Sequence, residues 1–196
     1  MPTSFGLERK AMIFVETELA GAYLVELEKR EDERGFFARL WCEREFATHG
    51  LTSRLAQVSL SFNRRRGTLR GMHYQAAPYE ESKMVHCVRG AIYDVIIDLR
   101  VGSHTHAKWF GVELSADNRR GVFVPAGFAH GFLTLTDDAE VLYHISHPYV
   151  AAAARGVRFD DPAFGIRWPI AIEVIAERDR NWPAYLTTMR CGANSR

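Results

Sequence analysis

Side chains that can exchange protons or balance charge gather in one stretch of the sequence, LSFNRRRGTLRGMHYQAAPYEESKMVHC. Successive side chains of a β-strand point to opposite faces, so a strand here places His73 and Gln75 on one face and Arg70 on the other. Lys83 follows ten residues after His73, a separation at which a second strand can bring the two together across a sheet face. An isolated histidine is more often a core side chain, but a histidine beside a lysine can do acid–base chemistry. The spacing predicts an acid–base pocket around His73 and Lys83.

Four arginines lie in the same stretch, at Arg64, Arg65, Arg66 and Arg70. The three consecutive arginines are typical of a solvated hairpin tip. Arg70 lies inside the expected strand, where a guanidinium needs a partner. A phosphate is one candidate, because guanidinium binds phosphate oxygens through paired hydrogen bonds.

A second motif, GVFVPAGFAHGFLTL, has Pro125 and Gly127 in a turn that leads His130 into the next strand. Together with the GxxxxxH spacing that ends at His73, this PxGxxH pattern resembles the two motifs of the cupin superfamily. Metal-binding cupins carry a second histidine two residues after the first, and Gln75 occupies that place here. Two imidazoles beside a lysine make a poor site for zinc, iron or manganese. We therefore expect no catalytic metal.

Other reactive side chains carry weaker signals. The sequence has no GxGxxG, GxxxxGK[ST] or GxSxG motif, so we expect no cofactor. Cys87 lies in an apolar run and is predicted to be a core residue. Tyr143 and Asp179, taken alone, are typical of a half-buried strand tyrosine and a surface carboxylate. Residue types and spacing alone therefore predict an acid–base pocket but no specific reaction.

These residues need a scaffold that positions them, and the sequence predicts one made of strands. Short runs rich in Val, Ile, Phe and Tyr recur between Gly, Pro, Asn and Asp, which is typical of an all-β sandwich or barrel. The dipeptide Arg89-Gly90 predicts a hairpin turn, because glycine supplies the positive φ of such turns. One short helix is expected over 43–49, and an irregular or partly helical tail from Asp160 onward. The expected strands cover residues 12–16, 22–28, 36–41, 55–62, 68–75, 83–88, 91–99, 107–114, 121–124, 131–135, 140–147 and 156–159.

The expected strands, together with length, composition and charge, limit the class of protein. Consecutive antiparallel strands are best closed as a double-sheet jelly roll or related barrel, which protects strand edges and leaves a mouth for a ligand. A chain of 196 residues, 47% of them hydrophobic, predicts a single domain over 1–196. A net charge of +1 gives no reason to expect nucleic-acid or membrane binding. Sparse cysteines without a CxxC pair, and the lack of a signal peptide or long apolar run, favour a soluble cytoplasmic protein.

Several motifs follow one another along nearly the whole chain. In chain order, the motifs are ERGFF at 33–37, RGMHYQ at 70–75, GAIYDVIIDLR at 90–100, PAGFAHGF at 125–132, DPAFGIRWP at 161–169 and ERD at 177–179. Two single residues, Lys83 and Tyr143, belong to the same series. In this order the motifs resemble the dTDP-4-dehydrorhamnose 3,5-epimerase family of sugar-nucleotide enzymes. The resemblance implies a cupin-type double-stranded β-helix (jelly roll) that works without metal or cofactor and forms a homodimer. It also implies a nucleotide-diphospho 4-keto-6-deoxyhexose as substrate.

The resemblance further implies roles for individual residues. His73 would remove a proton from a carbon next to the ketone, with Asp179 holding its ring. Lys83 would stabilise the enolate oxygen, and Tyr143 would return a proton from the opposite face, which inverts the carbon. This chemistry needs a base, an opposed proton donor and a cation at the oxygen. The residues implied to bind substrate are His130, through a hydrogen bond in the pocket, Arg34 and Arg70 at the diphosphate, and Phe37, Gln57 and Tyr149 around the nucleotide base and sugar.

The prediction is an epimerase that inverts carbons 3 and 5 of a dTDP-4-keto-6-deoxyhexose in the biosynthesis of a rhamnose-type sugar. Two positions that contact the nucleotide in the family differ here: Arg39 replaces an acid and Ser59 replaces an asparagine. Alternatives with the same mechanism are inversion of a single centre, at carbon 3 or carbon 5, and use of a CDP- or GDP-linked sugar. A non-catalytic sugar-binding cupin would not need an opposed acid and base. A metal-dependent cupin oxygenase would need more ligands than two histidines.

Overall fold

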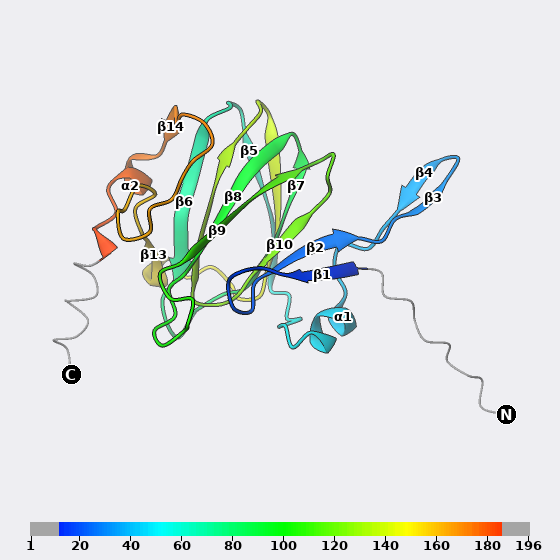
Figure 1. Cartoon of the computed structure of the whole chain (residues 1–196), viewed down its shortest axis with the longest axis horizontal. Coiled ribbons are helices and arrows are strands. Elements are labelled where there is room, and N and C mark those ends of the chain that lie inside the picture. The colour runs from blue at the N-terminus through cyan, green and yellow to red at the C-terminus, as the bar shows by residue number, and fades with distance from the viewer. Residues whose placement is uncertain (1–11, 186–196) are drawn as a thin grey trace.

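Two β-sheets pack face to face to form the body of the protein, in the computed structural model that describes residues 12–185 (Figure 1). The first sheet consists, in spatial order, of β1 (Met12–Glu16), β2 (Tyr23–Leu27), β10 (Gly121–Val124), β7 (Lys83–Arg89), β12 (Ala139–Ile145) and β5 (Gln57–Asn63). The second consists of β13 (Ala154–Gly156), β6 (Thr68–Gln75), β11 (Phe128–Thr134), β8 (Ala91–Asp98) and β9 (Trp109–Ser115), with the short β14 (Val174–Ile175) beside β6. All neighbouring strands are antiparallel except β14, which runs parallel to β6.

The remaining elements lie outside the two sheets. β3 (Arg30–Asp32) and β4 (Gly35–Phe37) form a separate hairpin that projects from the body of the protein (Figure 1). The helices are short: α1 (Glu43–Thr48), a 3-10 turn over Ala151–Ala153, and α2 (Glu177–Arg180). No helix within residues 12–185 has the length and apolar character needed to cross a membrane.

Alternating side chains on the two sheets build the main core. Val85 and Cys87 of β7 pack in one buried cluster with Ile92 and Ile96 of β8, so the inward faces of both sheets contribute. Alternation of this kind buries one face of each strand and drives the sheets together. Cys87 is therefore a core residue as predicted, and burial raises the pKa of its thiol to about 11.

The C-terminal segment covers the outward face of the second sheet. Phe164 and Tyr185 pack there against Met72 of β6 and Val95 of β8 in a second buried cluster. The predicted irregular or partly helical tail thus wraps the barrel and carries α2 to the side of β6. Residues 186–196 of that tail lie outside the described residues.

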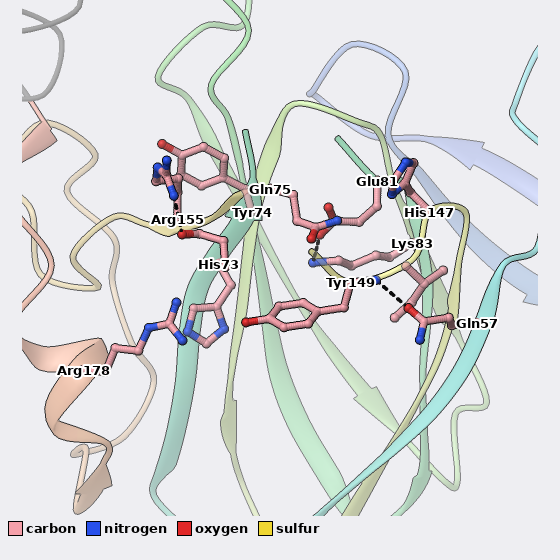
Figure 2. A pocket seen from close by; sticks show the side chains of 12 residues that line it. Gln57, His73, Tyr74, Gln75, Glu81, Lys83, His147, Tyr149, Arg155 and Arg178 are labelled. Carbon is pink, nitrogen blue, oxygen red and sulfur yellow. Dashed lines mark hydrogen bonds and ion pairs between the residues drawn. The ribbon is translucent and has the colours of Figure 1, made fainter. Parts of the chain in front are cut away.

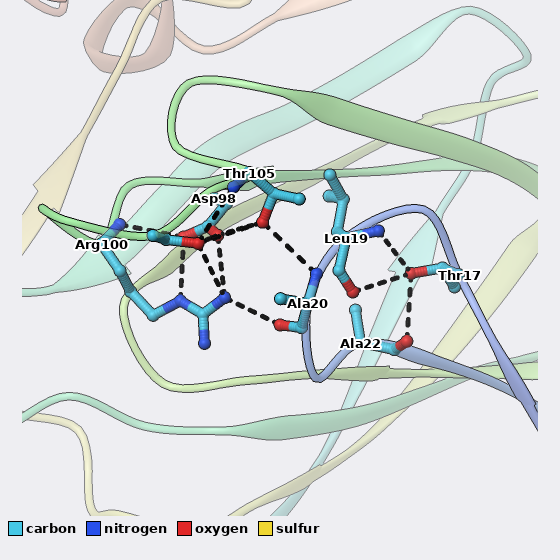
Figure 3. A network of polar contacts seen from close by, with 8 residues as sticks. Thr17, Leu19, Ala20, Ala22, Asp98, Arg100 and Thr105 are labelled. Atoms are coloured by element: carbon cyan, nitrogen blue, oxygen red, sulfur yellow. Dashed lines mark hydrogen bonds and ion pairs between the residues drawn. The ribbon is translucent and has the colours of Figure 1, made fainter.

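A polar network fixes the turn between β1 and β2 to the end of β8 (Figure 3). The fully buried Asp98 accepts hydrogen bonds from Arg100, from Ser103 Oγ at 2.6 Å and from Thr105 Oγ1 at 2.6 Å. Arg100 also donates to the carbonyl of Ala20 at 2.7 Å. Burial raises the pKa of Asp98, but the hydrogen bonds outweigh burial and hold it well below the ordinary range.

The expected all-β jelly roll with few helices is confirmed, and the strands expected over 12–16, 68–75 and 121–124 have these bounds. The strand expected over 36–41 is shorter, because β4 pairs only with the three-residue β3 and ends at Phe37. The tail contains β14 and α2, which are too short to leave a periodic pattern in the sequence.

Candidate active site

Two adjoining cavities open on the face of the molecule where β5, β6, β7 and β12 come together. The first, the Tyr149 cavity, has a volume of about 310 Å³ and is drawn in Figure 2. The second, the Tyr143 cavity, has a volume of about 290 Å³. His73, Lys83 and Ile145 line both cavities, so the two form a continuous space around the predicted acid–base pair.

Most of the residues predicted for the site line one of these cavities. Gln57 and Tyr149 line the Tyr149 cavity, where the Tyr149 N–H donates to Gln57 Oε1 at 2.7 Å (Figure 2). The Tyr143 cavity contains Arg70, His130 and Tyr143 in addition to His73 and Lys83.

Arg34 and Phe37 do not line either cavity of this chain. Both lie on the β3–β4 hairpin, which points away from the two sheets (Figure 1). Phe37 is 74% exposed, which is unusual for a large apolar side chain. Arg34 pairs with Asp32 of the same hairpin.

A hydrogen bond joins His73 of β6 to Asp179 of α2. His73 Nε2 donates to Asp179 Oδ1 at 2.6 Å, and the Gly71 N–H donates to the other carboxylate oxygen at 3.2 Å. A neutral imidazole carries one hydrogen, so this arrangement leaves Nδ1 of His73 as a proton acceptor. Burial raises the pKa of Asp179, but the bonds from His73 and Gly71 and the charge of Arg178 hold it below the usual range. The carboxylate is therefore ionised and orients the imidazole.

A bulge in β6 places Arg70 on the same side as His73. On the partner strand β11, His130 lies opposite His73 and Phe132 opposite Arg70, so two residues of β11 span three of β6. Gly71 lies within the bulge at φ +129°, and a Cβ there would lie 2.6 Å from the backbone of β11. Strict alternation predicted opposite faces for Arg70 and His73. That prediction was wrong, because the extra residue reverses the alternation.

Lys83 reaches the site from the other sheet. It is on β7 of the first sheet and His73 is on β6 of the second, so the two meet across the interior rather than on one sheet face. Lys83 Nζ lies 2.9 Å from Glu81 Oε1. Glu81 lines the Tyr149 cavity. It was not predicted as a site residue, because two consecutive glutamates, Glu80 and Glu81, are typical of a solvated turn.

Tyr143 of β12 faces the Tyr143 cavity next to His130, with ring centroids 6.0 Å apart. Burial and the nearby charge of Asp94 raise the pKa of Tyr143, and Arg70 offsets only part of this effect. The Tyr143 hydroxyl therefore keeps its proton near neutral pH and can donate a hydrogen bond.

His130 is itself held by a buried carboxylate. Its Nε2 donates to Asp94 Oδ2 of β8 at 2.8 Å, and the two side chains are only 5% and 1% exposed. Asp94 was not predicted, although an acid inside the apolar run of GAIYDVIIDLR is a signal for a buried partner.

Gln75 stands where metal-binding cupins have a second histidine, and its amide connects two loops. It donates to the carbonyls of Tyr79 at 2.9 Å and Pro148 at 3.2 Å and accepts from the Val150 N–H at 2.6 Å. Across residues 12–185, no three His, Cys, Asp or Glu side chains are grouped in a way that could hold a metal ion.

Further cationic side chains at the Tyr149 cavity were missed by sequence reasoning. Arg155 follows the 3-10 turn, and Arg178 lies on α2 (Figure 2). The Arg178 guanidinium stacks over the Trp182 ring, 5.0 Å from its centroid. Of the two positions that differ from the family pattern, Ser59 lines the Tyr143 cavity. Arg39 instead pairs with Glu45 of α1 at 2.6 Å.

Comparison with known proteins identifies the family of this chain. Residues 16–186 match the model of the dTDP-4-dehydrorhamnose 3,5-epimerase family. The chain is 41% identical over 180 residues to the dTDP-4-dehydrorhamnose 3,5-epimerase of Sinorhizobium fredii, an alignment that covers 91% of this chain and 92% of that protein. It is 38% identical over 164 residues to a dTDP-4-dehydrorhamnose 3-epimerase of Streptomyces niveus, covering 83% of this chain and 79% of that one.

A solved structure is similar over nearly the same span. The dTDP-4-dehydrorhamnose 3,5-epimerase of Bacillus anthracis, crystallised with TDP and PPi bound, superimposes with a TM-score of 0.85 at 39% identity. The match covers 89% of this chain and 99% of that one. The chain therefore belongs to the dTDP-4-dehydrorhamnose 3,5-epimerase family.

Proposed function

We propose that the protein inverts carbons 3 and 5 of a dTDP-4-keto-6-deoxyhexose in the biosynthesis of a rhamnose-type sugar. Family membership supports this reaction, and one observation carries it. His73 from the second sheet and Tyr143 from the first line the same cavity, and the Lys83 side chain lines it as well. A sugar that lies in this cavity would have a proton acceptor and a proton donor on different sides.

The reaction follows from the acidity of carbons next to a ketone. His73 Nδ1 takes the proton, and the negative charge moves to the carbonyl oxygen as an enolate. Asp179 stabilises the imidazolium, and Lys83 donates a hydrogen bond to the enolate oxygen. The Tyr143 hydroxyl then delivers a proton to the opposite face, which inverts the carbon. One proton leaves and one returns at each centre, so the reaction needs no oxidant and no cofactor.

Arg70 and His130 are proposed to bind the substrate directly. Arg70 Nε donates to Asn63 Oδ1 at 2.7 Å, which leaves the outer edge of its guanidinium available for a phosphate or a sugar oxygen. The buried Asp94 holds His130 in place at the sugar. Gln57 and Tyr149 are joined to each other at the Tyr149 cavity and suit the nucleotide.

We further propose a homodimer in which the β3–β4 hairpin of each protomer reaches the site of the other. This arrangement would let Arg34 and Phe37 act on substrate although they lie away from their own cavities. An exposed apolar row on the outer face of β5, formed by Val58, Leu60 and Phe62, gives two copies a surface to bury. Sedimentation analysis is expected to show a dimer.

Mixed dimers test the exchange of hairpins. We expect His73→Asn and Arg34→Ala to be nearly inactive alone, because each variant damages every site. In a mixed dimer one site would combine an intact His73 with an intact Arg34. After refolding of an equal mixture, activity should recover to about a quarter of the wild-type value, since about half of the dimers are mixed and have one good site of two. No recovery would contradict the exchange.

The proposed setting is the cytoplasm, and residues 1–196 are proposed to form one domain. The two cysteines within the described residues, Cys42 and Cys87, are free thiols, in keeping with a reducing compartment.

Inversion of a single centre is the second candidate, favoured by the similarity to the Streptomyces niveus 3-epimerase. To separate the two, dTDP-4-keto-6-deoxyglucose would be converted in the presence of a rhamnose-forming reductase, and the product identified by proton NMR. A rhamnose product supports the double inversion, and a singly inverted sugar supports the second candidate. CDP- and GDP-linked 4-keto sugars would be tested in parallel, and failure on all three nucleotides would contradict an epimerase.

A further inference from the structure

Lys83 shares the wall of the Tyr149 cavity with a carboxylate. Glu81 precedes it by two residues, and Glu81 Oε1 lies 2.9 Å from Lys83 Nζ (Figure 2). The side chains are 12% exposed for Lys83 and 7% for Glu81. The second carboxylate oxygen, Oε2, is buried and has no hydrogen-bond partner within the described protein.

This pair is costly for the fold. Burying two opposite charges typically gains little or no stability, because desolvation offsets their attraction. The buried Oε2 without a hydrogen bond adds a further cost, because that oxygen has lost its water and gained no partner in exchange. An apolar pair of similar size would serve the packing as well or better, so stability does not account for Glu81.

The backbone on both sides of Glu81 is held firmly. The Ser82 N–H donates to Ser146 Oγ at 2.9 Å, and the Ser146 N–H donates to the Ser82 carbonyl at 3.0 Å. On the other side, the Gln75 amide donates to the Tyr79 carbonyl at 2.9 Å. The carboxylate therefore projects from a fixed segment, which is what is needed to fix another group.

Lys83 is the group that needs to be fixed. A lysine ammonium sits at the end of a flexible four-carbon chain, and a donor stabilises a developing charge best when it is held in place beforehand. We propose that Glu81 is a positioning residue that holds the Lys83 ammonium at the point where the enolate oxygen forms. Glu81 takes one N–H of the ammonium, and the other two remain available to the cavity. This inference rests on the proposed function.

Three variants test it in the full-length protein. In Glu81→Leu, kcat should fall about 10–100-fold, a fraction of the loss expected for removing an oxyanion donor outright, with KM changed by less than about threefold. In Glu81→Gln, the amide oxygen still accepts from the ammonium, so kcat should return to within about fivefold of wild type. Glu80→Leu is the matched control, because Glu80 is exposed and lines neither cavity. Thermal melting checks that each variant folds.

A double-mutant cycle shows whether Glu81 acts through Lys83. In a Lys83→Met background, Glu81→Leu should have no further effect on kcat, because the group that it positions is gone. If the kcat losses of Lys83→Met and Glu81→Leu multiply in the double variant, the proposal is overturned. A Glu81→Leu variant with wild-type kcat would also overturn it.

A readout that does not depend on turnover separates this inference from the proposed function. The chain has four lysines, so the ¹⁵N resonances of their ammonium groups form a simple spectrum. A slowly exchanging resonance that disappears in Lys83→Met should also disappear in Glu81→Leu and persist in Glu80→Leu. If this pattern is seen while the wild type converts no 4-keto sugar, the positioning is right and the function is wrong. A resonance unchanged in Glu81→Leu would overturn the positioning.

Discussion

Replacing Asp179 with asparagine changes charge and hydrogen bonding at the proposed base while hardly changing shape. The carboxylate accepts from His73 at 2.6 Å and from the Gly71 N–H at 3.2 Å. An asparagine offers one acceptor and one donor group. Its oxygen must face the Gly71 N–H, so its NH₂ group faces His73 Nε2. That nitrogen would have to accept, which moves the ring proton to Nδ1 and blocks the atom that we propose as the base.

Two contributions set the size of the effect on kcat. Loss of a hydrogen bond to a charged group costs about 1.5–3 kcal/mol when the imidazolium forms. Forcing the wrong tautomer adds about 1–3 kcal/mol, the cost of an unmatched polar group. The sum of about 2.5–6 kcal/mol corresponds to a loss of about 10²–10⁴-fold in kcat. KM should change by less than about threefold, because Asp179 lies behind His73 and is almost fully buried.

The assay is the initial rate of deuterium entry from heavy water, followed by NMR, with circular dichroism to confirm folding. Asp179→Ala is the matched comparison, because it removes the acceptor without imposing a donor. We expect asparagine to be at least as damaging as alanine. An asparagine variant within about tenfold of wild-type kcat, or one clearly more active than the alanine variant, would refute the tautomer argument.

Three further predictions test other parts of the structure. In Tyr143→Phe, inversion should slow by about 10²-fold or more while His73 still exchanges the substrate proton for deuterium with retained configuration; equal loss of exchange and inversion would contradict the division of roles. Asp98→Asn should cost about 2–4 kcal/mol of unfolding free energy at pH 7 through its lost charged hydrogen bonds. Because the folded pKa of Asp98 is depressed, this stability is present above the unfolded pKa and lost as pH falls below about 4, so the gap between variant and wild type in urea titrations should narrow there. Gly71→Ala should cost about 2–4 kcal/mol, since its φ is positive and its Cβ meets β11; a cost under about 0.5 kcal/mol would contradict the close approach.

The strands were predictable because their signal is local. Short runs rich in Val, Ile, Phe and Tyr recur between Gly, Pro, Asn and Asp, and that pattern needs no knowledge of distant parts of the chain. The bulge in β6 was not predicted, because it depends on how closely β11 approaches. Gly71 inside a strand was nevertheless a usable sign, since glycine in such a position often marks a bulge.

The site was predictable in part. His73 and Lys83 stood out by type and spacing, and the structure brings them together. Asp179 could be connected to His73 only through the family resemblance, because more than a hundred residues separate them and α2 has no periodic signal. The position of Arg34 away from the cavities depends on the direction of the β3–β4 hairpin, which tertiary contacts determine and local sequence does not.

We propose that one site inverts two carbons by proton removal and return. The most direct test of this proposal is the number of deuterons in the product when dTDP-4-keto-6-deoxyglucose is incubated with the protein in heavy water and trapped by a rhamnose-forming reductase. We expect one deuteron at carbon 3 and one at carbon 5, and neither with His73→Asn. Deuterium at only one carbon, or equal incorporation by His73→Asn, would contradict it.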